Sequence, residues 1–164
     1  MAGDDIARKA AEVLDACRAA GLMVATAESC TGGLVAAALT ALPGSSEMME
    51  RGFVTYSNAA KTEMLGVPAA LIERDGAVSE AVARAMAEGA LHRSAAALAV
   101  AVTGIAGPGG GSAAKPVGLV WFACARRGGT VRTLRCVFPG DRGAVRHTAM
   151  AQALDLLREG AGRL

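Results

Sequence analysis

The sequence contains few aromatic residues and no long block of like charge. Phenylalanine, tryptophan and tyrosine make up only 3% of its 164 residues, and 17 basic residues nearly balance 15 acidic ones, giving a formal net charge of +2. A chain that binds nucleic acid through a charged tail carries a run of like charges. We therefore expect no nucleic-acid partner.

The sequence also lacks a long apolar run. No stretch approaches the roughly 20 apolar residues that a membrane-spanning helix requires. The N-terminal segment, MAGDDIARKA, carries acidic residues and no apolar core of signal-peptide length. These absences predict a cytoplasmic protein with no membrane partner.

Closely spaced cysteine pairs are absent as well. The four cysteines, Cys17, Cys30, Cys124 and Cys136, form no C-x-x-C motif and lie in apolar segments. Such a distribution is typical of reduced, buried thiols rather than of disulfides or metal ligands.

Small and aliphatic residues are abundant, and 52% of the chain is hydrophobic. A chain of this length can bury a core, so we expect a single domain spanning residues 1–164. Helices are expected at 6–20, 32–42, 58–65, 79–91 and 140–159, and strands at 22–27, 52–57, 96–103, 117–125 and 130–138. The last two strands read as an antiparallel hairpin. The pattern predicts an α/β fold, a three-layer α/β/α sandwich with a mixed, mostly parallel sheet of about five strands.

Three polar loops follow expected strands. They are TAESCTGG at 26–33, YSNAAK at 56–61 and TGIAGPGGGS at 103–112. Open α/β sheets bind ligands beyond the carboxyl ends of their strands. We therefore expect Ser29, Tyr56, Lys61 and the glycine-rich loop to converge.

Ser29 is a candidate nucleophile in this arrangement. We expect it at a helix N-terminus, where the N–H groups from Cys30 through Thr31, Gly32 and Gly33, or that of Gly104, could hold an oxyanion. The two histidines, His92 and His147, lie outside these loops. The base is then Lys61, whose amine can be neutral when buried, with the Tyr56 hydroxyl as a proton relay. The alternatives are an N-cap serine, a solvated lysine and a tyrosine at the edge of the core.

Other polar residues near these loops have simpler interpretations. Cys30 is a rival nucleophile, but it has no imidazole partner and is interpreted as a buried thiol. Glu28 is interpreted as an exposed acid in the turn. Arg142 and Arg146 lie four residues apart on one face of the last helix, where they either bind a phosphate or form a solvated basic face.

Read together, AESCTGG, RGFVTYSNAAK, GAVS, TGIAGPGGG, KPVG and GDRGAVR resemble the CinA C-terminal domain family, known as nicotinamide-nucleotide amidohydrolases. The resemblance covers about residues 5–158. It implies a three-layer domain that hydrolyses the carboxamide of nicotinamide mononucleotide to nicotinate mononucleotide and ammonia in pyridine-nucleotide recycling. It implies no metal and no organic cofactor. The chain has no room for the extra N-terminal domain of longer members, so it resembles the stand-alone form.

The resemblance also assigns residues. It makes Ser29 the nucleophile and associates Tyr56 and Lys61 with its activation. The expected substrate contacts are Thr31, Asn58, Thr103, Gly104 and Arg142. The chain departs from its relatives where they often carry acids, at Ala59, Gly109 and Ala113-Ala114.

Two other functions stay open at this point. One is a non-catalytic nucleotide-binding or interaction module of a competence-associated system, and the other is an amidase for a different small amide. The alanine-rich helices could also support a homodimer.

Overall fold

The computed structural model describes residues 2–162. Its centre is a five-stranded sheet in the order β2-β1-β3-β4-β5. The strands are β1 (Val24–Glu28), β2 (Met49–Val54), β3 (Leu98–Gly104), β4 (Leu119–Arg126) and β5 (Val131–Val137). β1 runs parallel to both β2 and β3, whereas β4 is antiparallel to β3 and to β5. The predicted mixed sheet and its terminal hairpin are confirmed.

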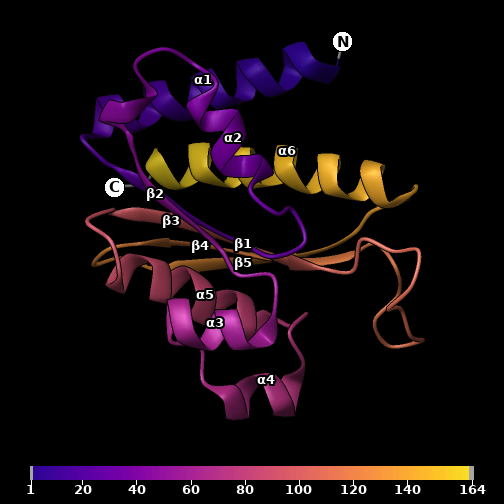
Figure 1. The fold of residues 1–164 in the computed structure, drawn as a ribbon. Helices are drawn as coiled ribbons and strands as arrows, with labels where there is room; N and C mark the ends of the chain where they lie inside the picture. The colour runs from indigo at the N-terminus through magenta and orange to yellow at the C-terminus, as the bar shows by residue number, and fades with distance from the viewer. Residues whose placement is uncertain (1, 163–164) are drawn as a thin grey trace.

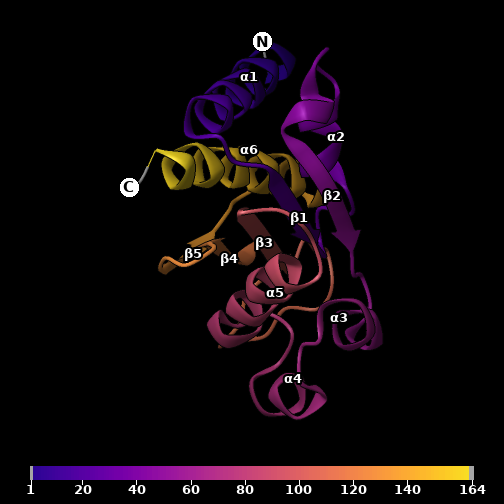
Figure 2. The ribbon, with the colours of Figure 1, turned by 90° about the vertical axis from the view of Figure 1, so that its left-hand side faces the viewer.

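Helices cover both faces of this sheet (Figure 1). One face carries α1 (Ala2–Ala20), α2 (Leu34–Thr40) and α6 (Arg142–Ala161), and the other carries α3 (Asn58–Leu65), α4 (Ala69–Asp75) and α5 (Glu80–His92). A 3₁₀ turn, η1 (Ser45–Glu47), follows α2. In Figure 2, turned by 90°, α1, α2 and α6 again lie on one side of the sheet and α3, α4 and α5 on the other. The predicted α/β sandwich is confirmed.

Alternating side chains of the central strands build two cores. Valines such as Val24, Val100 and Val102 pack toward α1, α2 and α6. Alanines such as Ala25 and Ala99 pack toward α5. All five residues of β1 are buried, because the strand lies between β2 and β3 and has helices on both faces. This burial fixes the strand whose end carries Ser29.

Capping residues define the long helices as expected. The Ser79 hydroxyl accepts a hydrogen bond from Val82 N–H at 3.3 Å, and the Asp141 carboxylate accepts one from Ala144 N–H at 2.9 Å. Within the described residues, no helix is long and apolar enough to cross a membrane.

Several details differ from the sequence prediction, among them the start of α1 at Ala2 rather than at residue 6. α2 begins at Leu34 rather than Gly32, because Gly32 and Gly33 have φ values of 59° and 109°, outside the helical region. β2 spans Met49–Val54 rather than 52–57, since its first residues pair with β1 through a register shift. α4 was not expected at all, because the seven residues after Pro68 form too short a periodic pattern.

Candidate active site

Ser29 lies directly beyond the carboxyl end of β1. Its N–H donates to Val102 O on β3 at 2.9 Å, and its carbonyl accepts from Gly32 N–H at 3.0 Å. The residue is 8% exposed. A tight turn rather than a helix therefore presents the Ser29 hydroxyl, and this turn stays attached to the buried sheet.

Lys61 approaches Ser29 from the first turns of α3. Its Nζ donates to Ser29 Oγ at 3.0 Å, to Thr55 O at 3.0 Å and to Tyr56 O at 3.4 Å. The side chain is only 1% exposed, and burial lowers its pKa below the ordinary lysine value because water no longer solvates the ammonium. The smaller effect of nearby Cys30 acts in the opposite direction. The predicted pairing of a serine with a buried lysine is therefore present in the structure.

A small cavity opens beside this pair. Its volume is about 200 Å³. The lining residues come from five segments: Ser29, Cys30, Tyr56, Asn58, Lys61, Ala77, Val78, Thr103, Gly104, Ala106 and Arg142. The convergence expected from the strand ends is thus observed for the serine, the tyrosine, the lysine and the start of the glycine-rich loop.

Tyr56 and Arg142 lie together among the residues that line the cavity. Tyr56 is 60% exposed, and its hydroxyl accepts a hydrogen bond from Arg142 Nη2 at 2.7 Å. The other guanidinium nitrogen of Arg142, Nη1, donates to Gly107 O at 2.9 Å. Arg142 therefore joins α6, the segment after β2 and the glycine-rich loop.

Asn58, Thr103 and Gly104 also line the cavity. Asn58 is exposed at the start of α3, whereas Thr103 is buried and donates from Oγ1 to Ala77 O at 2.9 Å. A Cβ at Gly104 would lie 2.7 Å from Val120 Cγ2 and 3.1 Å from Cys30 Sγ. The glycine is therefore required for the close approach of β3, β4 and the serine turn.

The remaining predicted substrate residues do not line the cavity. Thr31 is fully buried, and its Oγ1 has no hydrogen-bond partner among residues 2–162. Gly32 and Gly33 shape the turn that leads into α2. Arg146 donates from Nε to Cys30 O at 3.0 Å and from Nη2 to Thr31 O at 3.4 Å. The structure thus places these four residues in or behind the serine turn.

Glu28 was misinterpreted from the sequence as an exposed acid. It is completely buried, and its two carboxylate oxygens accept hydrogen bonds from Val35 N–H at 2.9 Å and Ala36 N–H at 3.1 Å. Glu28 therefore caps α2, and these two N–H groups are not available to an oxyanion. The alternation of Val24, Thr26 and Glu28 on one face of β1 was the signal that could have predicted an inward carboxylate.

Cys30 lies next to Ser29 but differs from it chemically. It is 5% exposed, and burial raises the pKa of its thiol to about 11. The thiol is therefore neutral near pH 7 and a poor nucleophile. The interpretation of Cys30 as a buried thiol is confirmed. Cys17 and Cys124 are likewise buried, whereas Cys136 is partly exposed.

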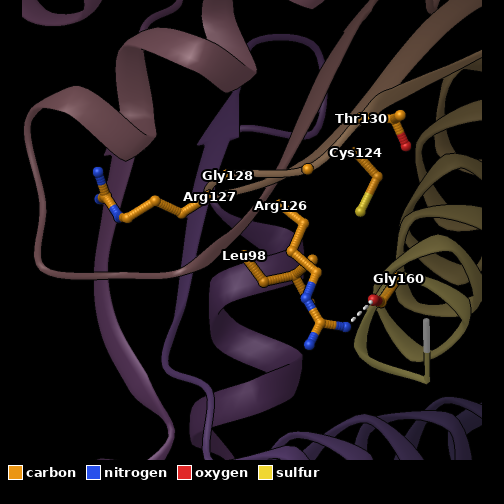
Figure 3. Close-up of a pocket in the computed structure, with 8 residues that line it drawn as sticks. Leu98, Cys124, Arg126, Arg127, Gly128, Thr130 and Gly160 are labelled. Atoms are coloured by element: carbon orange, nitrogen blue, oxygen red, sulfur yellow. Dashed lines mark hydrogen bonds between the residues drawn. The ribbon is translucent and has the colours of Figure 1, made fainter. Parts of the chain in front are cut away.

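A larger cavity of about 330 Å³ lies at the other end of β3 (Figure 3). Arg126 Nη1 donates there to Gly160 O at 3.1 Å, close to the C-terminus of α6. The Arg127 side chain points away from that of Arg126 in Figure 3 and donates to Leu91 O near the end of α5. The two arginines thus bind separate helix termini, as cations near helix C-termini commonly do, and do not converge on one ligand.

Within the described part of the chain, no group of three or more histidine, cysteine, aspartate and glutamate side chains is placed to hold a metal ion.

The structure defines an α/β sandwich whose buried serine–lysine pair lies at the carboxyl ends of parallel strands. The CinA C-terminal domain model matches residues 6–161. The chain therefore belongs to the CinA C-terminal domain family, and the resemblance noted from its motifs is confirmed.

Individual relatives agree with this assignment. The nicotinamide-nucleotide amidohydrolase PncC of Enterobacter agglomerans is 55% identical over 149 residues, which cover 90% of this chain and 91% of that protein. A CinA-like protein of Akkermansia muciniphila is 59% identical over 133 residues, which cover 81% of this chain but only 32% of that longer protein. The chain thus spans about a third of the length of this CinA-like relative.

A solved structure gives the same result. The crystal structure of the competence/damage inducible protein CihA from Agrobacterium tumefaciens superimposes with a TM-score of 0.93 at 50% sequence identity, covering 95% of each chain. The fold described above is therefore shared with this protein.

Proposed function

We propose that this protein is an amidohydrolase that converts nicotinamide mononucleotide to nicotinate mononucleotide and ammonia, with Ser29 as the nucleophile. The observation that carries the proposal is the 3.0 Å contact between Lys61 Nζ and Ser29 Oγ, made by a lysine that is 1% exposed. The name of the Enterobacter agglomerans relative supports the reaction class and the kind of substrate.

Lys61 is the proposed base. Burial lowers its pKa and so favours the neutral amine. The Ser29 hydroxyl then becomes the donor across the same 3.0 Å Oγ–Nζ distance, and the Nζ lone pair takes its proton. Ser29 Oγ then adds to the carboxamide carbon, and the carbonyl oxygen becomes an oxyanion. The cationic pyridinium ring of the substrate withdraws electrons from this carbon and favours the addition.

The proposed oxyanion donors are backbone N–H groups of the serine turn. Ser29 N–H is bonded to Val102 O, and Gly32 N–H is bonded to Ser29 O. Within the described chain, the N–H groups of Cys30 and Thr31 donate to no acceptor on another residue. Of these two residues, Cys30 lines the cavity, so its N–H is the first candidate.

The remaining steps return the proton. The Lys61 ammonium transfers it to the amide nitrogen, the C–N bond breaks, and ammonia leaves behind an ester on Ser29. Water then attacks the ester carbon with Lys61 again accepting a proton, and the serine is released together with the nicotinate product. We propose that the Tyr56 hydroxyl assists these transfers from its position beside the cavity.

Substrate binding is proposed to divide between the cavity and its mouth. A volume of about 200 Å³ lies below the roughly 300–1,000 Å³ of pockets that enclose a drug-sized ligand, so the nicotinamide ring enters and the ribose phosphate stays outside. Arg142 is the proposed phosphate ligand, because its guanidinium is exposed where it contacts Tyr56. Asn58, Thr103 and Gly104 are proposed to contact the part of the substrate inside the cavity.

An ammonia-release assay with three substrates tests the proposal. We expect release from nicotinamide mononucleotide, much less from its riboside and least from free nicotinamide, since only the mononucleotide carries the phosphate. Equal release from the mononucleotide and the riboside would contradict the phosphate contact. Absence of release from all three, with retained binding of the mononucleotide, would favour a non-catalytic binding module.

A further inference from the structure

Arg146 binds the backbone of the serine turn from α6. Its Nε donates to Cys30 O at 3.0 Å and its Nη2 to Thr31 O at 3.4 Å. The same Nη2 atom lies 3.4 Å from the position that a Cβ at Gly32 would occupy. The guanidinium therefore packs along three consecutive residues that follow Ser29.

The Arg146 guanidinium is half-buried, and no carboxylate among residues 2–162 forms an ion pair with it. Its positive charge is directed at peptide carbonyls instead. Charge-assisted hydrogen bonds of this kind are about twice as strong as neutral ones. The charge consequently polarises the peptide groups of the turn without being neutralised by an acid.

The charge of Arg146 polarises the proposed oxyanion donors, the N–H groups of Cys30 and Thr31, through hydrogen bonds and the peptide groups that they join. The contact with Thr31 O strengthens the Gly32 N–H, which donates to Ser29 O at 3.0 Å. The Ser29 carbonyl shares its peptide group with the Cys30 N–H, so this donor becomes stronger in turn. The contact with Cys30 O acts in the same way on the Thr31 N–H.

Arg142 and Arg146 differ in what they face. Arg142 lines the cavity and contacts the Tyr56 hydroxyl, whereas Arg146 does not line the cavity and donates its hydrogen bonds to backbone carbonyls of the turn. The two arginines, one helical turn apart, therefore serve different tasks.

We infer that Arg146 is a positioning residue, which fixes and polarises the Ser29 turn through the Cys30 and Thr31 carbonyls, and is not a phosphate ligand. This inference rests on the proposed function. It assigns a role in the rate of the chemical step rather than in substrate affinity.

Steady-state kinetics of matched arginine variants test this role. Arg146→Gln is expected to lower kcat roughly tenfold to a hundredfold, somewhat less than direct removal of an oxyanion donor, with KM within about twofold of wild type. Arg146→Lys, which keeps the charge but loses the fork, is expected to recover part of this loss. Arg158→Gln, on the exposed side of the same helix next to Glu12, is the control and should leave both constants unchanged.

The ratio of mononucleotide to riboside turnover separates positioning from phosphate binding. Arg146→Gln should keep the wild-type ratio, while Arg142→Gln should lose most of it. A raised KM together with a lost ratio in Arg146→Gln would overturn the inference, and so would an unchanged kcat.

Amide hydrogen exchange at Gly32 provides a readout that does not need activity. The Gly32 N–H should exchange faster in Arg146→Gln than in wild type or Arg158→Gln, because the turn loses its attachment to α6. Unchanged protection would refute the positioning role even in a protein without amidase activity. Absence of ammonia release by wild type would contradict the proposed function and leave this exchange result to decide the inference.

Discussion

At the scale of single residues, the site depends on a lysine that is kept out of water. Lys61 is surrounded by the Ser29 hydroxyl and the carbonyls of Thr55 and Tyr56, which are hydrogen-bond partners without a full negative charge. Burial therefore lowers the pKa of the amine, and within residues 2–162 no carboxylate forms an ion pair with it. This environment distinguishes Lys61 from a surface lysine.

The lowered pKa of Lys61 has a consequence for the pH dependence of the reaction. The base must be neutral, so kcat/KM should rise with pH and level off above the pKa of Lys61, at a midpoint below that of an ordinary lysine. A pH profile of ammonia release measures this midpoint.

Lys61→Met should lose most turnover while still binding the mononucleotide. A Lys61→Met protein with unimpaired turnover would contradict the assignment of the base.

The positions of Ser29 and Lys61 could be predicted from the sequence, whereas the contacts of Glu28 and Arg146 could not. Ser29 and Lys61 could be brought together because the carboxyl ends of parallel strands meet at one edge of a sheet. The role of Glu28 could not be recognised, because two glycines in non-helical conformations delay the start of α2 and carry its first N–H groups back over the strand. The contacts of Arg146 could not be foreseen either, since they depend on how α6 packs against the turn.

At the scale of elements, the short helix α2 is held by the buried Glu28 carboxylate. Glu28→Gln should reduce the free energy of unfolding by about 1–3 kcal/mol, because an amide offers one acceptor oxygen and no charge to the two N–H groups of α2. Urea unfolding at neutral pH measures this change. Glu73→Gln, at an exposed position of α4, is the matched control and should alter stability by less than about 0.5 kcal/mol. Equal stability of Glu28→Gln and wild type would show that the cap contributes nothing.

The elements were predictable in proportion to their burial. β1 and β3 are short apolar runs and were located within two residues. β2 lies at the sheet edge, where Glu50 and Arg51 interrupt the apolar pattern and the pairing with β1 shifts register. α4 packs against α3 and α5 with only Ile72 buried, so its sequence carries little periodic signal.

At the scale of the whole molecule, one sheet connects all the parts of the site. Both core clusters contain side chains from β1, β3 and β4, so the two faces cannot separate without breaking the same strands. We propose that residues 1–164 form a single domain. Thermal unfolding followed by far-UV circular dichroism and by fluorescence of Trp121, the single tryptophan, should give one coincident transition. Two separate transitions would contradict a single domain.

The two cavities described above lie at opposite ends of the same sheet. β3 runs from Leu98, beside Arg126, to Gly104, beside Ser29, so the larger cavity and the serine–lysine pair lie at opposite ends of one strand. The size of a cavity therefore does not identify the site in this protein. The arrangement of reactive groups around the smaller cavity indicates the site instead.

The measurement that tests the account most directly is ammonia release from nicotinamide mononucleotide by wild type, Ser29→Ala and Cys30→Ala under identical conditions. The account predicts that Ser29→Ala loses at least about a thousandfold in rate, as expected for removal of a nucleophile, while Cys30→Ala keeps most of the wild-type rate because its thiol, with a pKa of about 11, takes no part. Wild-type release by Ser29→Ala, or a loss in Cys30→Ala as large as that expected for Ser29→Ala, would contradict it.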